Sequence, residues 1–122
     1  MHVPSIIFAA IAVAGFAFSV PRVKAAGFDC REARSQIERL ICADPDLSRL
    51  DEELAQDFEA IRRETAGRDG ETGQPSLPFG EDHARWREAV RDQCRDSACL
   101  KAAYEARLAK VRQDWSEVLR GR

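Results

Sequence analysis

The chain has 122 residues, of which 19 are Lys or Arg and 21 are Asp or Glu, so its formal net charge is −2. This length leaves room for a single domain. The mild acidic excess argues against nucleic acid and anionic lipid as partners, and it permits a cationic protein partner.

Residues 1–25 have the pattern of a cleaved secretory signal peptide. Residues 6–20 read IIFAAIAVAGFAFSV, an uncharged stretch shorter than the roughly 20 residues of a membrane span. Small or apolar side chains at Ala25 and two positions before it predict cleavage after Ala25 or one residue later. That cut removes Arg22 and Lys24, leaving 97 residues with 17 basic and 21 acidic side chains, a net charge of −4. Because the first five residues lack Lys and Arg, the alternative is an uncleaved N-terminal anchor.

The four cysteines all follow this segment, and their even number in an exported chain indicates two disulfides with three possible pairings. A zinc site is a poor alternative, because the spacings C-x11-C and C-x4-C lack the close pairs of structural zinc sites. No Cys-His cluster accompanies them. The cysteines are Cys30, Cys42, Cys94 and Cys99.

The exported part is expected to begin with a short helix. Ser35 and Glu38 match a capping box, in which each side chain bonds the backbone amide of the other residue. This helix should end near Cys42. Asp44 and Pro45 then begin the next helix, because Asp is a good N-cap and Pro suits the first helical position.

The second helix is expected over residues 45–64, because apolar residues recur there at steps of three and four. They are Leu47, Leu50, Leu54, Phe58 and Ile61. Residues 67–80, GRDGETGQPSLPFG, predict a flexible loop that is rich in glycine and proline.

A third helix is expected over residues 81–94, with Trp86, Val90 and Cys94 at four-residue steps. A fourth helix, over residues 99–119, carries a second long apolar stripe. Its members are Leu100, Tyr104, Leu108, Val111, Trp115 and Val118. No alternation typical of a strand is found in the sequence.

Residues 26–122 are therefore predicted to form an all-α domain. It is a small disulfide-stapled bundle of about four helices, two long and amphipathic and two short. Geometry favours local disulfides, because Cys30 and Cys42 flank one short helix and Cys94 and Cys99 flank a four-residue turn. A crossed pairing between the two ends of the domain is the alternative.

Candidate chemical groups are few. His83 is the one histidine after the leader, and we interpret it as a surface residue in the first turn of a helix. A dense group of acids does not match the calcium-loop pattern, and the simplest interpretation is a solvated helix face with capping carboxylates. We therefore expect no enzyme, no cofactor and no metal site. The acids are Asp44, Asp46, Asp51 and Glu52.

Two groups of residues match a known family. The first is Phe28-Asp29-Cys30, Glu38, Ile41-Cys42, Asp44-Pro45, Leu47, Leu50-Asp51 and Leu54. The second is Trp86, Arg91-Asp92, Cys94, Cys99-Leu100, Tyr104 and Arg107. Over nearly the whole exported part, the chain resembles the lysozyme inhibitor LprI N-terminal domain family. His83 departs from the family pattern, in which Gln is expected.

The resemblance implies a secreted or periplasmic, non-enzymatic binding protein that inhibits lysozyme by protein–protein contact. The partner would be a basic c-type lysozyme, steered by an acidic face of Asp44, Asp46, Asp51 and Glu52. The alternative is a periplasmic interaction or small-ligand module with another envelope partner, which an exposed groove between the second and fourth helices would favour. A small cell-wall hydrolase is a third interpretation, for which no nucleophile or base pair is visible.

Overall fold

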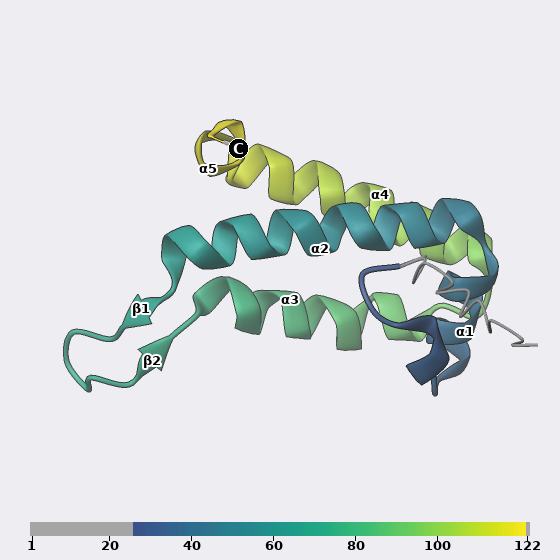
Figure 1. Ribbon diagram of the computed structural model, residues 1–122, viewed down its shortest axis with the longest axis horizontal. Helices are drawn as coiled ribbons and strands as arrows, with labels where there is room; N and C mark the ends of the chain where they lie inside the picture. The colour runs from purple at the N-terminus through teal and green to yellow at the C-terminus, as the bar shows by residue number, and fades with distance from the viewer. Residues whose placement is uncertain (1–25, 122) are drawn as a thin grey trace, which may run out of the picture.

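The computed structural model describes residues 26–121, which form five α-helices, two short 3-10 turns and one two-stranded hairpin. The predicted all-α bundle stapled by two disulfides is confirmed. The predicted signal peptide, residues 1–25, lies outside the described residues. The central element is α2 (Pro45–Thr65), which lies between α3 (Pro78–Ala89) and α4 (Ser97–Asp114) (Figure 1).

The first two helices begin where the capping signals predict. α1 (Gln36–Ala43) starts after Ser35, whose hydroxyl accepts a hydrogen bond from the Glu38 amide at 3.0 Å. The Glu38 carboxylate in turn accepts from the Ser35 amide at 2.9 Å, which completes the capping box. Asp44 follows α1, and its carboxylate accepts two amide hydrogen bonds from the first turn of α2. These local bonds orient α1 against α2.

The two disulfides have the predicted local pairing. Cys30 lies in the turn η1 (Cys30–Glu32) and is bonded to Cys42 near the end of α1, with Cα atoms 5.8 Å apart. Cys94 precedes α4 and is bonded to Cys99 in its first turn, with Cα atoms 5.5 Å apart. The crossed alternative is therefore wrong. The bonds tie the lead-in segment to α1 and the chain before α4 to α4 itself.

The core lies mainly between α1, α2 and α4, where apolar side chains of the three helices interdigitate. Burial of each large aliphatic side chain contributes about 1.5–3 kcal/mol to folding. Phe58 of the predicted α2 stripe is only half-buried and its ring faces α3. The buried apolar residues are Ala26, Ile37, Ile41, Leu47, Leu50, Leu54, Ala60, Ile61, Phe79, Cys94, Leu100, Tyr104, Leu108 and Val111.

The third helix is shorter at its C-terminus than the sequence predicts. It ends at Ala89, because the backbone of Val90 (φ −123°, ψ −66°) leaves the helical region and the turn η2 (Arg91–Gln93) follows. This bend brings Cys94 to its disulfide partner. Val90 was predicted on the apolar stripe, but its side chain is 43% exposed. The prediction was wrong because the apolar spacing continues through the bend.

The fourth predicted helix is divided in a similar way. α4 ends at Asp114, and Trp115 (φ −114°, ψ 24°) separates it from α5 (Ser116–Arg120). After the break, the Trp115 ring is in a T-shaped contact with Phe79, with centroids 5.6 Å apart. The second tryptophan thus joins α3 to the end of α4.

The segment predicted as a loop contains a small hairpin and the first residues of α3. β1 (Gly67–Arg68) pairs in antiparallel fashion with β2 (Pro75–Ser76), and the hairpin projects beyond the ends of α2 and α3 (Figure 1). The Asp69 carboxylate accepts two amide hydrogen bonds across the turn. Gly73 has φ +68°, a conformation that favours glycine. Two-residue strands are too short to give an alternating pattern, so the sequence did not predict them.

Candidate functional site

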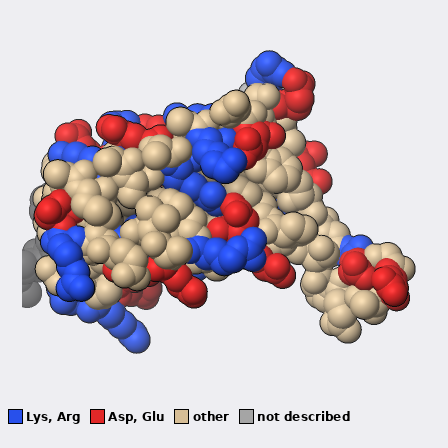
Figure 2. Space-filling view, turned by 180° about the vertical axis from the view of Figure 1, so that it is seen from behind, with Lys and Arg blue, Asp and Glu red and all other residues tan. Residues whose placement is uncertain are grey.

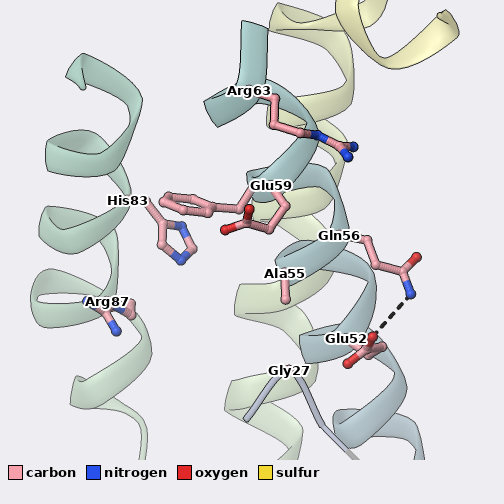
Figure 3. Close-up of a pocket in the computed structure, with 9 residues that line it drawn as sticks. Gly27, Glu52, Ala55, Gln56, Glu59, Arg63, His83 and Arg87 are labelled. Carbon is pink, nitrogen blue, oxygen red and sulfur yellow. Dashed lines mark hydrogen bonds between the residues drawn. The ribbon is translucent and has the colours of Figure 1, made fainter. Parts of the chain in front are cut away.

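A groove of about 850 Å³ lies between α2 and α3. It exists because α2 turns its aliphatic stripe toward α4 and presents small and polar residues to α3. In Figure 3, Glu59 of α2 and His83 of α3 point into the space between the helices, and Gly27 of the N-terminal segment lies at one end. The lining residues are Gly27, Glu52, Ala55, Gln56, Phe58, Glu59, Arg63, His83 and Arg87.

The floor of the groove is aromatic. The His83 ring lies 5.1 Å from Phe58 and is stacked on Trp86 at 5.5 Å between centroids. Trp86 and Tyr104 in turn are in a T-shaped contact, with centroids 5.4 Å apart. Of the aromatic residues that the sequence assigned to the core, Tyr104 is fully buried, whereas Trp86 and Trp115 are half-buried. In the groove itself, the half-buried rings of Phe58 and His83 give a surface that a ligand can contact.

His83 is not the surface residue that the sequence predicted. It lies in the second turn of α3 and is half-buried, because the helix begins earlier than expected and turns this position toward α2. Burial is the largest of the effects that lower the pKa of His83 from 6.5 to about 4; Arg107, Arg87 and Arg91 contribute to the same shift, and Asp82 opposes it. The imidazole is therefore neutral at pH 7. Its Nδ1 is buried and has no hydrogen-bond partner among residues 26–121.

Arg107 of α4 packs against the same aromatic cluster. Its guanidinium lies 5.6 Å from the ring centroids of both Phe79 and Trp86, a cation–π geometry. It also donates to Asp82 at 2.8 Å, which lowers the pKa of that carboxyl group. The side chain is 6% exposed, so it is a buried cation with an anionic partner. Arg107 therefore positions α3 against α4 and adds positive charge behind His83.

Charged side chains of both signs line the groove, with two acids and Arg63 on α2 and Arg87 on α3. The two acids are Glu52 and Glu59. Glu59 is paired with Arg62 at 2.9 Å, and Arg62 lowers its pKa. Glu52 accepts one bond, from the Gln56 amide at 3.2 Å, while its Oε2 is buried and has no partner in the described part of the chain. Glu52 thus keeps an uncompensated charge.

Among the residues that the structure describes, neither of the lining arginines has an ion-pair partner. Arg87 lies on α3, and Arg63 lies near the end of α2 (Figure 3). Elsewhere on the surface, arginines such as Arg49 and Arg112 are paired with Glu53. The groove therefore collects charged groups that the fold itself does not neutralise.

The N-terminal segment closes one end of the groove through Asp51. The Asp51 carboxylate accepts from the Gly27 amide at 2.8 Å and from the Tyr104 hydroxyl at 2.5 Å. Burial and then the charge of Asp51 raise the pKa of Tyr104 above its usual range, so the hydroxyl stays protonated. A Cβ at Gly27 would lie 2.7 Å from the Ala55 Cβ, so only glycine permits this approach.

The predicted acidic face is not one continuous surface. Asp44 and Asp46 lie at the start of α2 and share Lys101, at 3.1 and 3.5 Å, and Lys101 lowers the pKa of Asp44. Asp51 is engaged by the two hydrogen bonds described above. Glu52 lines the groove instead. Seen from behind, the molecule has intermingled acidic and basic side chains, with a basic group near the middle of that face (Figure 2).

The described residues offer no metal centre, because no three His, Cys, Asp or Glu side chains are grouped closely enough to bind an ion. All four cysteines are in disulfides. Within residues 26–121, no helix has both the length and the apolar character that a membrane crossing requires. The groove supplies hydrogen-bond acceptors, guanidinium donors and aromatic surface, which together suit the binding of a polar ligand or a protein side chain.

Sequence reasoning did not find this groove. His83 and Arg87 are four residues apart, a spacing that places them on one face of a helix, and this was the available signal. Their position opposite Glu52 depends on how α3 packs on α2, which periodicity does not encode. The comparisons add no family, since no protein-family model, curated protein or solved structure matches the chain.

Proposed function

We propose that this protein is an exported, non-enzymatic binding protein that acts by protein–protein contact, in the manner of a lysozyme inhibitor. The observation that carries the proposal is the α2–α3 groove, which holds charged side chains without partners in the described fold. An unpaired charge beside an apolar floor is costly in a monomer, and a partner that supplies the opposite charge recovers that cost.

Export is supported by two features. Residues 6–20 are uncharged and apolar, and the two disulfides are compatible with an oxidising, extracytoplasmic compartment. We assign the protein to the periplasm or the cell exterior, after removal of residues 1–25. The four cysteines then have a structural role: one disulfide links the lead-in segment to α1, and the other links the chain before α4 to α4.

A basic c-type lysozyme is the proposed partner. The resemblance of the motif residues to lysozyme inhibitors supports this choice, as does the acidic balance of the chain. Glu52 in the groove and Asp46 at the start of α2 are the acids that we expect to meet a basic partner. Asp51 is excluded from that role, since its carboxylate already holds Gly27 and Tyr104.

The test is a cell-wall lysis assay, in which the purified oxidised protein is titrated into a c-type lysozyme at low and moderate salt. We expect saturable inhibition that weakens as salt increases and disappears after reduction. Glu52→Lys should reduce inhibition at least about tenfold, because it reverses a charge that lines the groove. Glu105→Lys, a reversal at an exposed site on α4, is the matched control and should leave inhibition within about twofold. Full lysis at micromolar excess of the wild type contradicts the proposal.

A second candidate is a module that binds a small ligand or an envelope partner other than lysozyme. The expected sign for it was an exposed groove between the second and fourth helices, whereas the groove observed lies between α2 and α3. The negative charge of Glu52 on α2 and the positive charge of Arg87 on α3 favour this candidate. These two charges also indicate which chemical class of ligand the groove can bind.

A further inference from the structure

We propose that the α2–α3 groove binds a short zwitterionic peptide. The ligand's ammonium group lies at Glu52 on α2, its carboxylate lies at Arg87 on α3, and its apolar body rests on Ala55 and Phe58. This site goes beyond the inhibition of lysozyme and does not depend on it.

The charges of the two walls select this ligand. Figure 3 places Glu52 and Arg87 on opposite sides of the groove, and neither has an ion-pair partner among the described residues. A ligand with only a positive charge would be repelled by Arg87, which acts beside Arg91 and Arg107 around His83. A ligand with only a negative charge would face Glu52 and Glu59. A molecule with both charges is attracted by both walls.

Two buried atoms without hydrogen-bond partners in the described chain belong to residues that line the groove. Glu52 Oε2 and His83 Nδ1 are both buried and lack a hydrogen bond within residues 26–121, and both residues line the groove. A carboxylate only accepts hydrogen bonds, so Glu52 needs a donor such as an ammonium or amide N–H. Rotation about its last side-chain bond exchanges the two oxygens at little cost, so either one can meet the ligand.

The neutral imidazole fits the middle of a peptide. Its low pKa keeps His83 uncharged at pH 7, so one ring nitrogen donates and the other accepts. A peptide bond offers one donor and one acceptor and therefore matches a neutral imidazole. The adjacent Phe58 ring, 5.1 Å away, supplies the apolar contact for a small aliphatic side chain.

The size of the groove agrees with this class of ligand. Small-molecule sites have volumes of about 300–1,000 Å³ with an apolar lining and a few oriented polar groups. The groove has about 850 Å³ and places its charges on two helices and its apolar groups between them. An open groove of this kind favours modest affinity, so we expect dissociation constants in the high-micromolar to millimolar range.

The experiment uses alanyl-alanine and trialanine as probes, added to the ¹⁵N-labelled oxidised protein and followed by amide chemical shifts. We expect saturable shifts at amides of α2 and α3 that line the groove, together with a change in Trp86 fluorescence, because Trp86 stacks on His83. N-acetylation of the peptide removes its ammonium, and C-terminal amidation removes its carboxylate. Each blocked peptide should bind at least about tenfold more weakly.

Matched variants assign each charge. Glu52→Gln should weaken the unmodified peptide about tenfold and leave the affinity of the N-acetylated peptide unchanged. Arg87→Gln should likewise weaken binding of the unmodified peptide about tenfold and leave the affinity of the C-terminally amidated peptide unchanged. Glu105→Gln and Arg95→Gln, exposed sites outside the groove, should bind like the wild type. Circular dichroism of each variant checks that the fold is intact.

Two results would overturn the proposal. One is the absence of saturable shifts with either unmodified peptide up to about 10 mM, a concentration well above the expected dissociation constants. The other is equal binding of blocked and unmodified peptides, which would show that the charges do not select the ligand. Both results are independent of lysozyme inhibition, so failure of this proposal and failure of the proposed function are distinguishable.

Discussion

The two sides of α2 differ in whether their buried polar groups have hydrogen-bond partners. Toward α4, apolar side chains are almost completely buried, and the carboxylate of Asp57 accepts from Arg112 at 2.9 Å while that of Asp51 accepts from Tyr104. Toward α3, Phe79 is buried but Phe58, His83 and Trp86 are half-buried, and the polar atoms Glu52 Oε2 and His83 Nδ1 have no partner in the described chain.

This difference separates the parts of the molecule that hold the fold from those available for binding. Buried polar groups that are hydrogen-bonded fix the position of one helix on another, whereas those without a partner carry an energetic cost. The side of α2 facing α4 therefore accounts for stability. We infer that the side facing α3 is retained for contact with another molecule. The following changes test whether the two sides behave so differently.

The largest effect is expected in the core, in the first turn of α4. Leu100→Ala removes a fully buried side chain and should lower the free energy of unfolding by about 2–5 kcal/mol. Arg87→Ala, in the groove, should change it by less than about 0.5 kcal/mol. Urea denaturation followed by circular dichroism measures both. Equal losses for the two variants would contradict the division into a closed and an open side.

The next largest effects are expected from removal of the disulfides, and the two should differ in how much stability is lost. Replacing Cys30 and Cys42 by alanine opens a link between residues 12 apart and should cost about 3 kcal/mol. Replacing Cys94 and Cys99 opens a link between residues 5 apart and should cost about 2 kcal/mol, because less chain entropy is restored. Thermal unfolding of the two double variants gives the order. The opposite order would mean that native-state packing, and not loop closure, dominates.

Removal of the Tyr104 hydroxyl tests a single hydrogen bond on the α4 side of α2. Tyr104→Phe leaves Asp51 with only the Gly27 amide and should lower the free energy of unfolding by about 1–3 kcal/mol. A double-mutant cycle with Asp51→Asn separates the contribution of this bond from that of packing. Additive effects of the two substitutions would show that the hydroxyl and the carboxylate do not interact.

The smallest effect concerns the pH dependence of stability on the α3 side. The pKa of His83 falls from 6.5 to about 4 on folding, so unfolding takes up a proton between these values. The stability due to the neutral ring is complete above about pH 6.5 and is lost as the pH decreases toward 4. After allowance for solvent screening, the loss is about 1–2 kcal/mol. Urea denaturation at several pH values should show a smaller slope for His83→Gln, and an unchanged slope would refute the burial argument.

The features that were predictable from the sequence are those with local causes. The capping box of Ser35 and Glu38 and the Asp44-Pro45 junction involve neighbours a few residues apart, so their side chains meet whatever the tertiary fold. The disulfides were predictable for the same reason, since each closes a short segment. The stripe on α2 was long enough to mark which face is buried, except at Phe58.

The features that the sequence did not reveal depend on packing between distant segments. An apolar spacing of three and four continues across Val90 and Trp115, yet the backbone bends at both because Cys94 must reach Cys99 and the Trp115 ring contacts Phe79. The acids at the start of α2 were assigned to one face. The α2–α4 contact separates Asp51 from the other acids, since the Asp51 carboxylate accepts a hydrogen bond from Tyr104 of α4.

The most direct test of the account is a map of the surface that a lysozyme contacts. Amide chemical shifts of the ¹⁵N-labelled oxidised protein would be recorded with and without an equimolar c-type lysozyme at low salt. The account predicts that the affected amides cluster along the groove between α2 and α3, around Glu52, His83 and Arg87. Shifts confined to the outer face of α4, or none at about 100 µM of each protein, would contradict it.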